Sequence, residues 1–139
     1  MVRHRTMFLY LTLCATILAL TVPACSFSAS TAKISDAKMA RDQDGKHPTK
    51  VFSPDDTFYC VADLSNAPDD TKVRAVWTAV DVENTKPDTK IKEASTKSGS
   101  GQLQFNLSNN GSWPAGDYKV ELFMNDAKDP TQTLEFKVQ

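Results

Sequence analysis

The chain has 139 residues, of which 40% are hydrophobic and 24% are charged, and this length suits one globular domain. Its formal net charge is −1, and its basic residues form no stripe or cluster. This composition argues against a nucleic-acid-binding surface, which needs a concentrated positive charge.

The first 24 residues have the layout of an export signal. Arg3 and Arg5 precede an uncharged apolar run at residues 8–20, and Pro23 ends the run. As a helix, this run would cover roughly 20 Å, less than the ~30 Å hydrocarbon core of a bilayer. We therefore expect residues 1–24 to be a removed signal peptide and not a permanent membrane span.

The residues around Cys25 resemble a bacterial lipobox. The stretch VPAC at residues 22–25 places an aliphatic residue three positions before a cysteine and a small residue directly before it, although Pro23 departs from the usual Ala, Ser or Thr. The resemblance implies a diacylglycerol on the Cys25 sulfur and an acyl chain on its amine, and two or more chains anchor a protein stably. Ser26, in place of Asp, resembles the default that sorts lipoproteins to the outer membrane of a two-membrane bacterium.

The same residues leave two alternatives to lipidation open. Val22 and Ala24 also suit an ordinary signal peptidase, which would give a soluble secreted or periplasmic protein. Cys14 leaves with the signal, so Cys25 and Cys60 remain in the mature chain. A Cys25–Cys60 disulfide would close a loop of about 35 residues and stabilise the fold by roughly 3–4 kcal/mol. If Cys25 is acylated instead, Cys60 is a free thiol that the fold must bury.

After a short polar tether at residues 25–32, the pattern is that of β-strands. Apolar residues recur at every second position in short runs, and Pro, Gly, Asn and Asp separate the runs. We expect a kinked edge strand at residues 33–40, a loop at residues 41–50 and a strand at residues 57–64. The expected buried face of that strand carries Phe58, Cys60, Ala62 and Leu64.

The later runs follow the same alternation. Trp77 is central to a run at residues 73–79 and is the predicted core residue. A weak strand at residues 90–94 carries lysines, which suit an exposed sheet edge. Three more strands are expected, at residues 102–108, 117–125 and 133–138. Together the runs predict an all-β, antiparallel sandwich of about seven strands over residues 33–139.

Two features of these strands are similar to immunoglobulin and fibronectin type III domains. Trp77 lies on the third strand and Gly116-Asp117-Tyr118 opens the sixth, like the core tryptophan and the tyrosine corner of that family. The stretch SWPAGDYKVELFMND is also similar to immunoglobulin-like modules of bacterial extracytoplasmic proteins. The resemblance implies a single immunoglobulin-like sandwich. It departs from antibody domains because no second cysteine could pair with Cys60 across the sheets.

Groups that could carry chemistry are sparse. Without the signal, His47 is the remaining histidine, and no activated serine or cysteine lies near it in the chain, so a small hydrolase using His47 is an unfavoured alternative. The stretch DQDG at residues 42–45 resembles the start of a calcium loop but lacks the closing glutamate. Cys60 is expected to point inward, and it has no histidine partner. The sequence therefore predicts no catalytic residue, no metal ligand and no cofactor.

Three aromatic residues are candidates for partner binding. Tyr59 and Phe123 fall on the solvent phase of their strands, and Trp113 lies in a turn, where it either anchors a partner or caps the end of the sandwich. We expect a membrane-anchored, non-catalytic module that binds a protein or glycan of the cell envelope or has a structural role there. An alternative of another class is a protease inhibitor that inserts the loops at residues 66–70 and 125–130 into an enzyme cleft.

Overall fold

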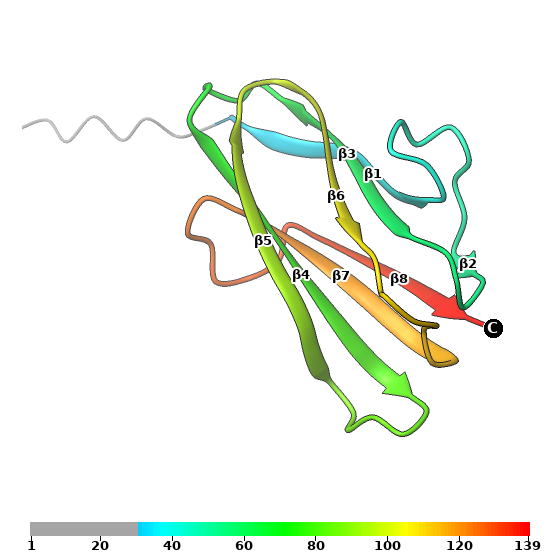
Figure 1. Cartoon of the computed structure of the whole chain (residues 1–139). Helices are drawn as coiled ribbons and strands as arrows, with labels where there is room; N and C mark the ends of the chain where they lie inside the picture. The colour runs from blue at the N-terminus through cyan, green and yellow to red at the C-terminus, as the bar shows by residue number, and fades with distance from the viewer. Residues whose placement is uncertain (1–30) are drawn as a thin grey trace, which may run out of the picture.

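The computed structural model describes residues 31–139, which form a sandwich of two β-sheets (Figure 1). The smaller sheet has the order β1-β3-β6, and the larger has the order β2-β8-β7-β4-β5. The strands are β1 (Lys33–Ala40), β2 (Val51–Phe52), β3 (Phe58–Ser65), β4 (Thr71–Val82), β5 (Thr89–Ser98), β6 (Gly101–Leu107), β7 (Gly116–Met124) and β8 (Gln132–Val138). No helix in this part of the chain is long and apolar enough to cross a bilayer. The expected signal peptide and Cys25 lie outside the described residues.

The strand pairing is antiparallel, with one exception. β2 runs parallel to β8, with Val51 beside Lys137 and Phe52 beside Val138. β2 has two residues and no alternation of its own, which is why the sequence predicted a loop and then a strand in this region. The sandwich therefore has eight strands, against the expected number of about seven.

The expected edge strands lie at the sheet edges. β1 is an edge of the smaller sheet, and its register against β3 shifts between Ser35 and Lys38, where Asp36 adopts a φ of 48°. This irregularity confirms the predicted kink. β5 is an edge of the larger sheet and extends beyond the predicted residues 90–94 at both ends.

The core lies between the sheets and is rich in aromatic rings. Trp77 is fully buried, as predicted, and the ring of Phe136 meets it edge-on with 6.1 Å between centroids. Phe58 contacts the rings of Phe52 at 4.9 Å and Phe136 at 4.9 Å, both edge-on. Edge-to-face aromatic pairs add to the free energy of burial, so this cluster fixes how the two sheets pack.

Tyr118 forms the predicted tyrosine corner. Its hydroxyl donates a hydrogen bond to the carbonyl oxygen of Pro114 at 2.7 Å, and its ring stacks on Phe136 at 5.6 Å. Burial raises the pKa of Tyr118. Gly116 starts this corner with a φ of 146°, and a Cβ there would overlap the backbone of β4 at Asp81. Glycine is therefore required where the turn passes close to β4.

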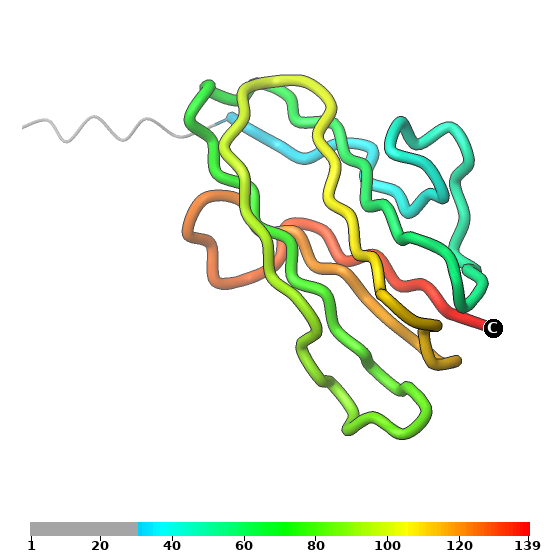
Figure 2. The backbone as a smooth tube through the Cα atoms, viewed as in Figure 1, coloured from blue at the N-terminus to red at the C-terminus, as the bar shows by residue number. Residues whose placement is uncertain are grey.

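The two ends of the sandwich carry different loops (Figures 1 and 2). β1 begins at the end that holds the turns at residues 66–70, 99–100 and 125–131. The turns at residues 83–88 and 108–115 lie at the opposite end, where the C-terminus also lies. Lys33, where β1 begins, thus lies at the end of the sandwich opposite the C-terminus.

Candidate functional site

The three aromatic residues proposed for partner binding do not form one surface. Tyr59 is half-buried on the outer face of the smaller sheet, between Ala40 and Asn106 on the neighbouring strands. Phe123 lies on β7 in the larger sheet, and Trp113 lies in the turn before that strand. Each of the three could contribute to partner binding only together with residues other than the remaining two.

The expected exposure of Phe123 is wrong. Its alternation phase does point away from the core, but only 8% of the residue is accessible. Arg74 on β4 lies directly across from it, and the guanidinium carbon of Arg74 is 4.1 Å from the ring centroid. Glu93 on β5 forms an ion pair with the same guanidinium, with 3.6 Å between its Oε1 and Nη1 of Arg74. This cation–π contact covers the ring and leaves little of it for a partner.

Trp113 caps one end of the sandwich. It is 8% exposed and stacks on Phe58 with 4.8 Å between centroids. Its Nε1–H donates to the carbonyl oxygen of Asp56 at 3.0 Å, and its backbone N–H donates to that of Pro54 at 2.7 Å. Both polar groups are thus used within the fold, which confirms the interpretation of Trp113 as a cap.

The loop at residues 41–47 folds over the outer face of the smaller sheet. Gly45 is buried in contact with Val61, which is 1% exposed although its alternation phase points outward. The Asp42 carboxylate closes the loop by accepting hydrogen bonds from the backbone N–H groups of Lys46 at 2.9 Å and His47 at 2.7 Å. These bonds, the first above all, hold the pKa of Asp42 below its usual range.

His47 has one polar side-chain contact. Its Nδ1 lies 3.1 Å from the Asp42 carboxylate, and its side chain is 77% exposed. Within residues 31–139, no three His, Cys, Asp or Glu side chains are grouped so as to hold a metal ion. The arrangement closes a loop and brings no nucleophile to the imidazole.

Cys60 lies inside the core and has no disulfide partner among residues 31–139. It is fully buried on β3, as its position in the alternation predicted, and burial raises its pKa to about 12. Such a thiol is protonated at neutral pH and is neither a nucleophile nor a metal ligand.

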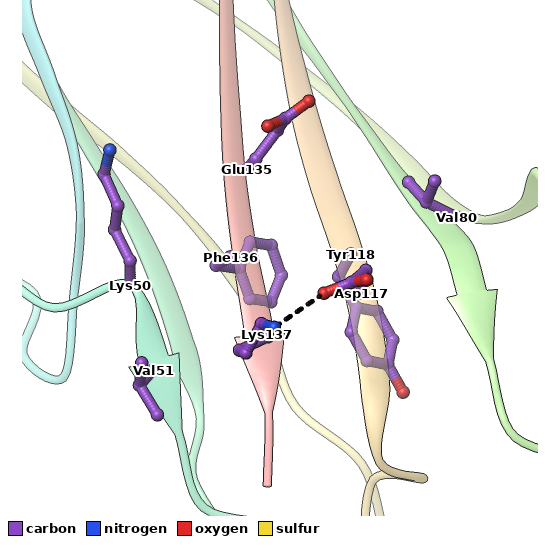
Figure 3. Close-up of a pocket in the computed structure, with 8 residues that line it drawn as sticks. All are labelled: Lys50, Val51, Val80, Asp117, Tyr118, Glu135, Phe136 and Lys137. Carbon is purple, nitrogen blue, oxygen red and sulfur yellow. Dashed lines mark ion pairs between the residues drawn. The ribbon is translucent and has the colours of Figure 1, made fainter.

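A groove lies on the outer face of the larger sheet where β2 joins β8 (Figure 3). It has a volume of about 420 Å³. Figure 3 shows Lys50 and Val51 on one side and Val80 on the other, with the ion pair of Lys137 and Asp117, at 3.4 Å, between them. Val51 is 38% exposed, unusually open for a large apolar side chain of this protein. The groove therefore combines apolar walls with charges of both signs.

A second groove of about 380 Å³ lies between β1 and β8. Its apolar lining comes from Ala37, Met39 and Leu134, and it shares Lys50 and Glu135 with the first groove. Sequence reasoning missed both grooves because they depend on β2, whose parallel pairing with β8 no local pattern indicates.

The two loops considered for protease inhibition lie at the same end of the sandwich, and Asn125 of the second loop bonds to Lys72, which follows the first loop in β4. The backbone N–H of Asn125 donates to the carbonyl oxygen of Lys72 at 2.7 Å, and the Lys72 N–H donates to the Asn125 side chain at 3.3 Å. This is the end at which β1 begins.

No protein-family model and no curated protein matches the chain. Among solved structures, an immunoglobulin-like protein from Pseudomonas aeruginosa matches with a TM-score of 0.52 and 11% identity, over 78% of this chain and 96% of that one. The fold is an immunoglobulin-like β-sandwich.

The immunoglobulin-like sandwich also matches parts of larger proteins. A GH3 β-glucosidase from Bifidobacterium adolescentis matches with a TM-score of 0.50 and 17% identity, over 78% of this chain and 17% of that one. The alkylpurine DNA glycosylase AlkC of Pseudomonas fluorescens matches with a TM-score of 0.48 and 14% identity, over 78% of this chain and 30% of that one. The chain thus spans less than a third of either enzyme, and the likeness concerns the fold alone.

Proposed function

We propose that the protein is a lipid-anchored, non-catalytic binding module of the bacterial cell envelope. The observation that carries the proposal is the stretch VPAC at residues 22–25, which resembles a lipobox directly after an export signal. Lipidation of Cys25 would leave Cys60 without a disulfide partner, and the full burial of Cys60 suits this arrangement because the fold would shield the unpaired thiol from solvent. An outer-membrane location in a two-membrane host is part of the proposal, because Ser26 follows the cysteine.

The position of Lys33 at one end of the sandwich supports a preferred orientation at the membrane. The chain from Cys25 to Lys33 can span at most roughly 28 Å, so a lipid on Cys25 would keep the sandwich close to the bilayer. The end that holds the turns at residues 66–70 and 125–131 would then face the lipid. This orientation disfavours the protease-inhibitor alternative in an anchored protein, because those are the loops that would have to enter an enzyme.

The proposed absence of catalysis has support from the two groups best suited to it. His47 is exposed and has Asp42 as its side-chain neighbour, with no nucleophile beside it. The Cys60 thiol has a pKa of about 12 and no access to solvent. The proposed function therefore rests on surfaces, and the two grooves beside β8 are candidates for it.

Detergent-phase partition of the full chain, produced in a bacterium that processes lipoproteins, tests the proposed anchor. The wild-type protein and a Cys60→Ala variant should enter the detergent phase, because this substitution leaves the acylated residue in place. A Cys25→Ser variant should stay in the aqueous phase. If the wild-type protein is found in the aqueous phase, or if Cys25→Ser partitions as the wild type does, the anchoring proposal is wrong.

A further inference from the structure

One side of β8 has no paired strand along most of its length, although β1 lies near it across the second groove. β2 pairs with β8 at Lys137 and Val138, where the Lys137 N–H donates to the carbonyl oxygen of Lys50 at 2.9 Å. Backbone N–H groups alternate in direction along a strand, so those of Thr133 and Glu135 point to the same side. No described residue forms a hydrogen bond with them there. The part of β8 that precedes Lys137 therefore presents unpaired backbone donors and acceptors on this side.

Both grooves adjoin this open edge, and they share Lys50 and Glu135 in their linings. The groove on the outer face is lined by Glu135 and Lys137, and the groove between β1 and β8 is lined by Thr133, Leu134 and Glu135. Successive side chains of a strand point to opposite faces of its sheet. A strand placed along the edge would thus send alternate side chains toward the two grooves.

We propose that the open edge of β8, residues 132–136, receives an extended segment of a partner protein as an additional strand. The proposal deepens the binding role proposed above and rests on it. Backbone hydrogen bonds from Thr133 and Glu135 would supply affinity, and the grooves would supply specificity, which is how strand addition at a sheet edge operates. An extended polypeptide is the ligand whose donors and acceptors repeat at the spacing that this edge presents.

The lining of the grooves indicates which side chains the added strand carries. On the side of β1, the apolar lining comes from Ala37, Met39 and Leu134, so a side chain with an apolar body suits it. The rest of this lining is polar or charged and comes from Lys38, Lys50, Thr133 and Glu135. On the outer face, the side chain would meet Val51 beside the charged groups of Lys50 and Glu135. The partner segment therefore alternates an apolar residue with a residue that is polar or amphipathic.

The opposite edge of the larger sheet fits this role less well. β5 is an edge of the same sheet, but neither of the two grooves described above touches it. Its side chains include Lys90, Lys92 and Lys97, all exposed, and lysines on an edge strand oppose pairing with another chain. The edge of β8 combines unpaired backbone groups with two adjoining grooves. The edge of β5 has unpaired backbone groups but adjoins neither groove.

Selection from a phage-displayed library of random nine-residue peptides tests the proposal. The target is the full chain as its bacterial host processes it, purified in detergent. We expect selected peptides to alternate apolar and polar residues and to slow amide hydrogen exchange at Thr133 and Glu135. Thr133→Pro removes the edge N–H and keeps the ladder to β7, so it should weaken binding at least tenfold. The matched variant Thr133→Ala keeps the N–H and should bind within about threefold of wild type.

Several results would overturn the inference. They are the failure to select any specific peptide, protection of amides elsewhere than on β8, and undiminished binding by a folded Thr133→Pro variant. Self-association that protects the same amides would show that a second copy, and no partner, occupies the edge. The exchange measurement on wild-type protein decides the matter even if Thr133→Pro does not fold. Peptide binding is measured in the same way on Cys25→Ser, which lacks the proposed lipid site, so failure of the edge proposal is distinguishable from failure of the anchoring proposal.

Discussion

Replacing Trp113 by alanine should remove a large part of the stability of the sandwich. The residue is 8% exposed, so the change takes away roughly 200 Å² of buried apolar surface, or about 5 kcal/mol at 25 cal/mol/Å². The hydrogen bond from Nε1 to Asp56 adds about 1 kcal/mol. Water can refill a site at the end of the sandwich, so we expect a net loss of about 3–4 kcal/mol.

Equilibrium urea denaturation measures this loss, because the fluorescence of the buried Trp77 remains as a reporter in every Trp113 variant. The matched variant Trp113→Phe keeps a ring against Phe58 and loses the Nε1 donor, so it should cost about 1–2 kcal/mol. A loss below about 1 kcal/mol for Trp113→Ala would refute the assignment as a cap, since exposed residues away from structural features seldom exceed 0.5 kcal/mol. It would return Trp113 to the candidates for partner binding.

Three further predictions concern the core and the turns. Native protein at pH 8 should not react with a thiol reagent at Cys60, and reaction should appear on unfolding. Burial raises the Cys60 pKa from 9.0 to about 12, so its contribution to stability is present below pH 9 and declines as the pH rises toward 12; the urea midpoint should fall less over this range in Cys60→Ala. The added Cβ of Gly116→Ala would overlap the backbone of β4, whereas that of Gly101→Ala meets open space. Gly116→Ala should therefore destabilise the fold by about 2 kcal/mol more than Gly101→Ala. Equal losses of unfolding free energy in denaturation would contradict this. Tyr118→Phe should lower the free energy of unfolding by about 1 kcal/mol, because it removes the hydrogen bond to Pro114, and an unchanged midpoint would show that the corner contributes nothing.

Much of the fold is predictable from the sequence because alternation is a local signal. The burial of Trp77 and Cys60 follows from the phase of their own strands. The tyrosine corner at Tyr118 follows from the adjacent glycine and turn residues. In each case, the structure around the residue depends on neighbours a few positions away in the chain or on apolar contacts that any well-packed core supplies.

The features that sequence reasoning missed depend on distant neighbours. Phe123 has the phase of an exposed residue, and Arg74 on another strand covers it. Val61 is buried because Gly45 comes back over its strand. The grooves beside β8 exist because β2 pairs with that strand from more than 80 positions away. Such contacts leave no periodic trace, so only the three-dimensional structure shows which outward side chains and which sheet edge remain open.

The central claim is that Cys25 carries lipid and holds the sandwich at the membrane. Mass spectrometry of the amino-terminal peptide from the processed protein tests it most directly. The account predicts a peptide that begins at Cys25 with a diacylglycerol on its sulfur and an acyl chain on its amine. A peptide that begins at Cys25 without lipid, or one joined to Cys60 by a disulfide, would contradict it.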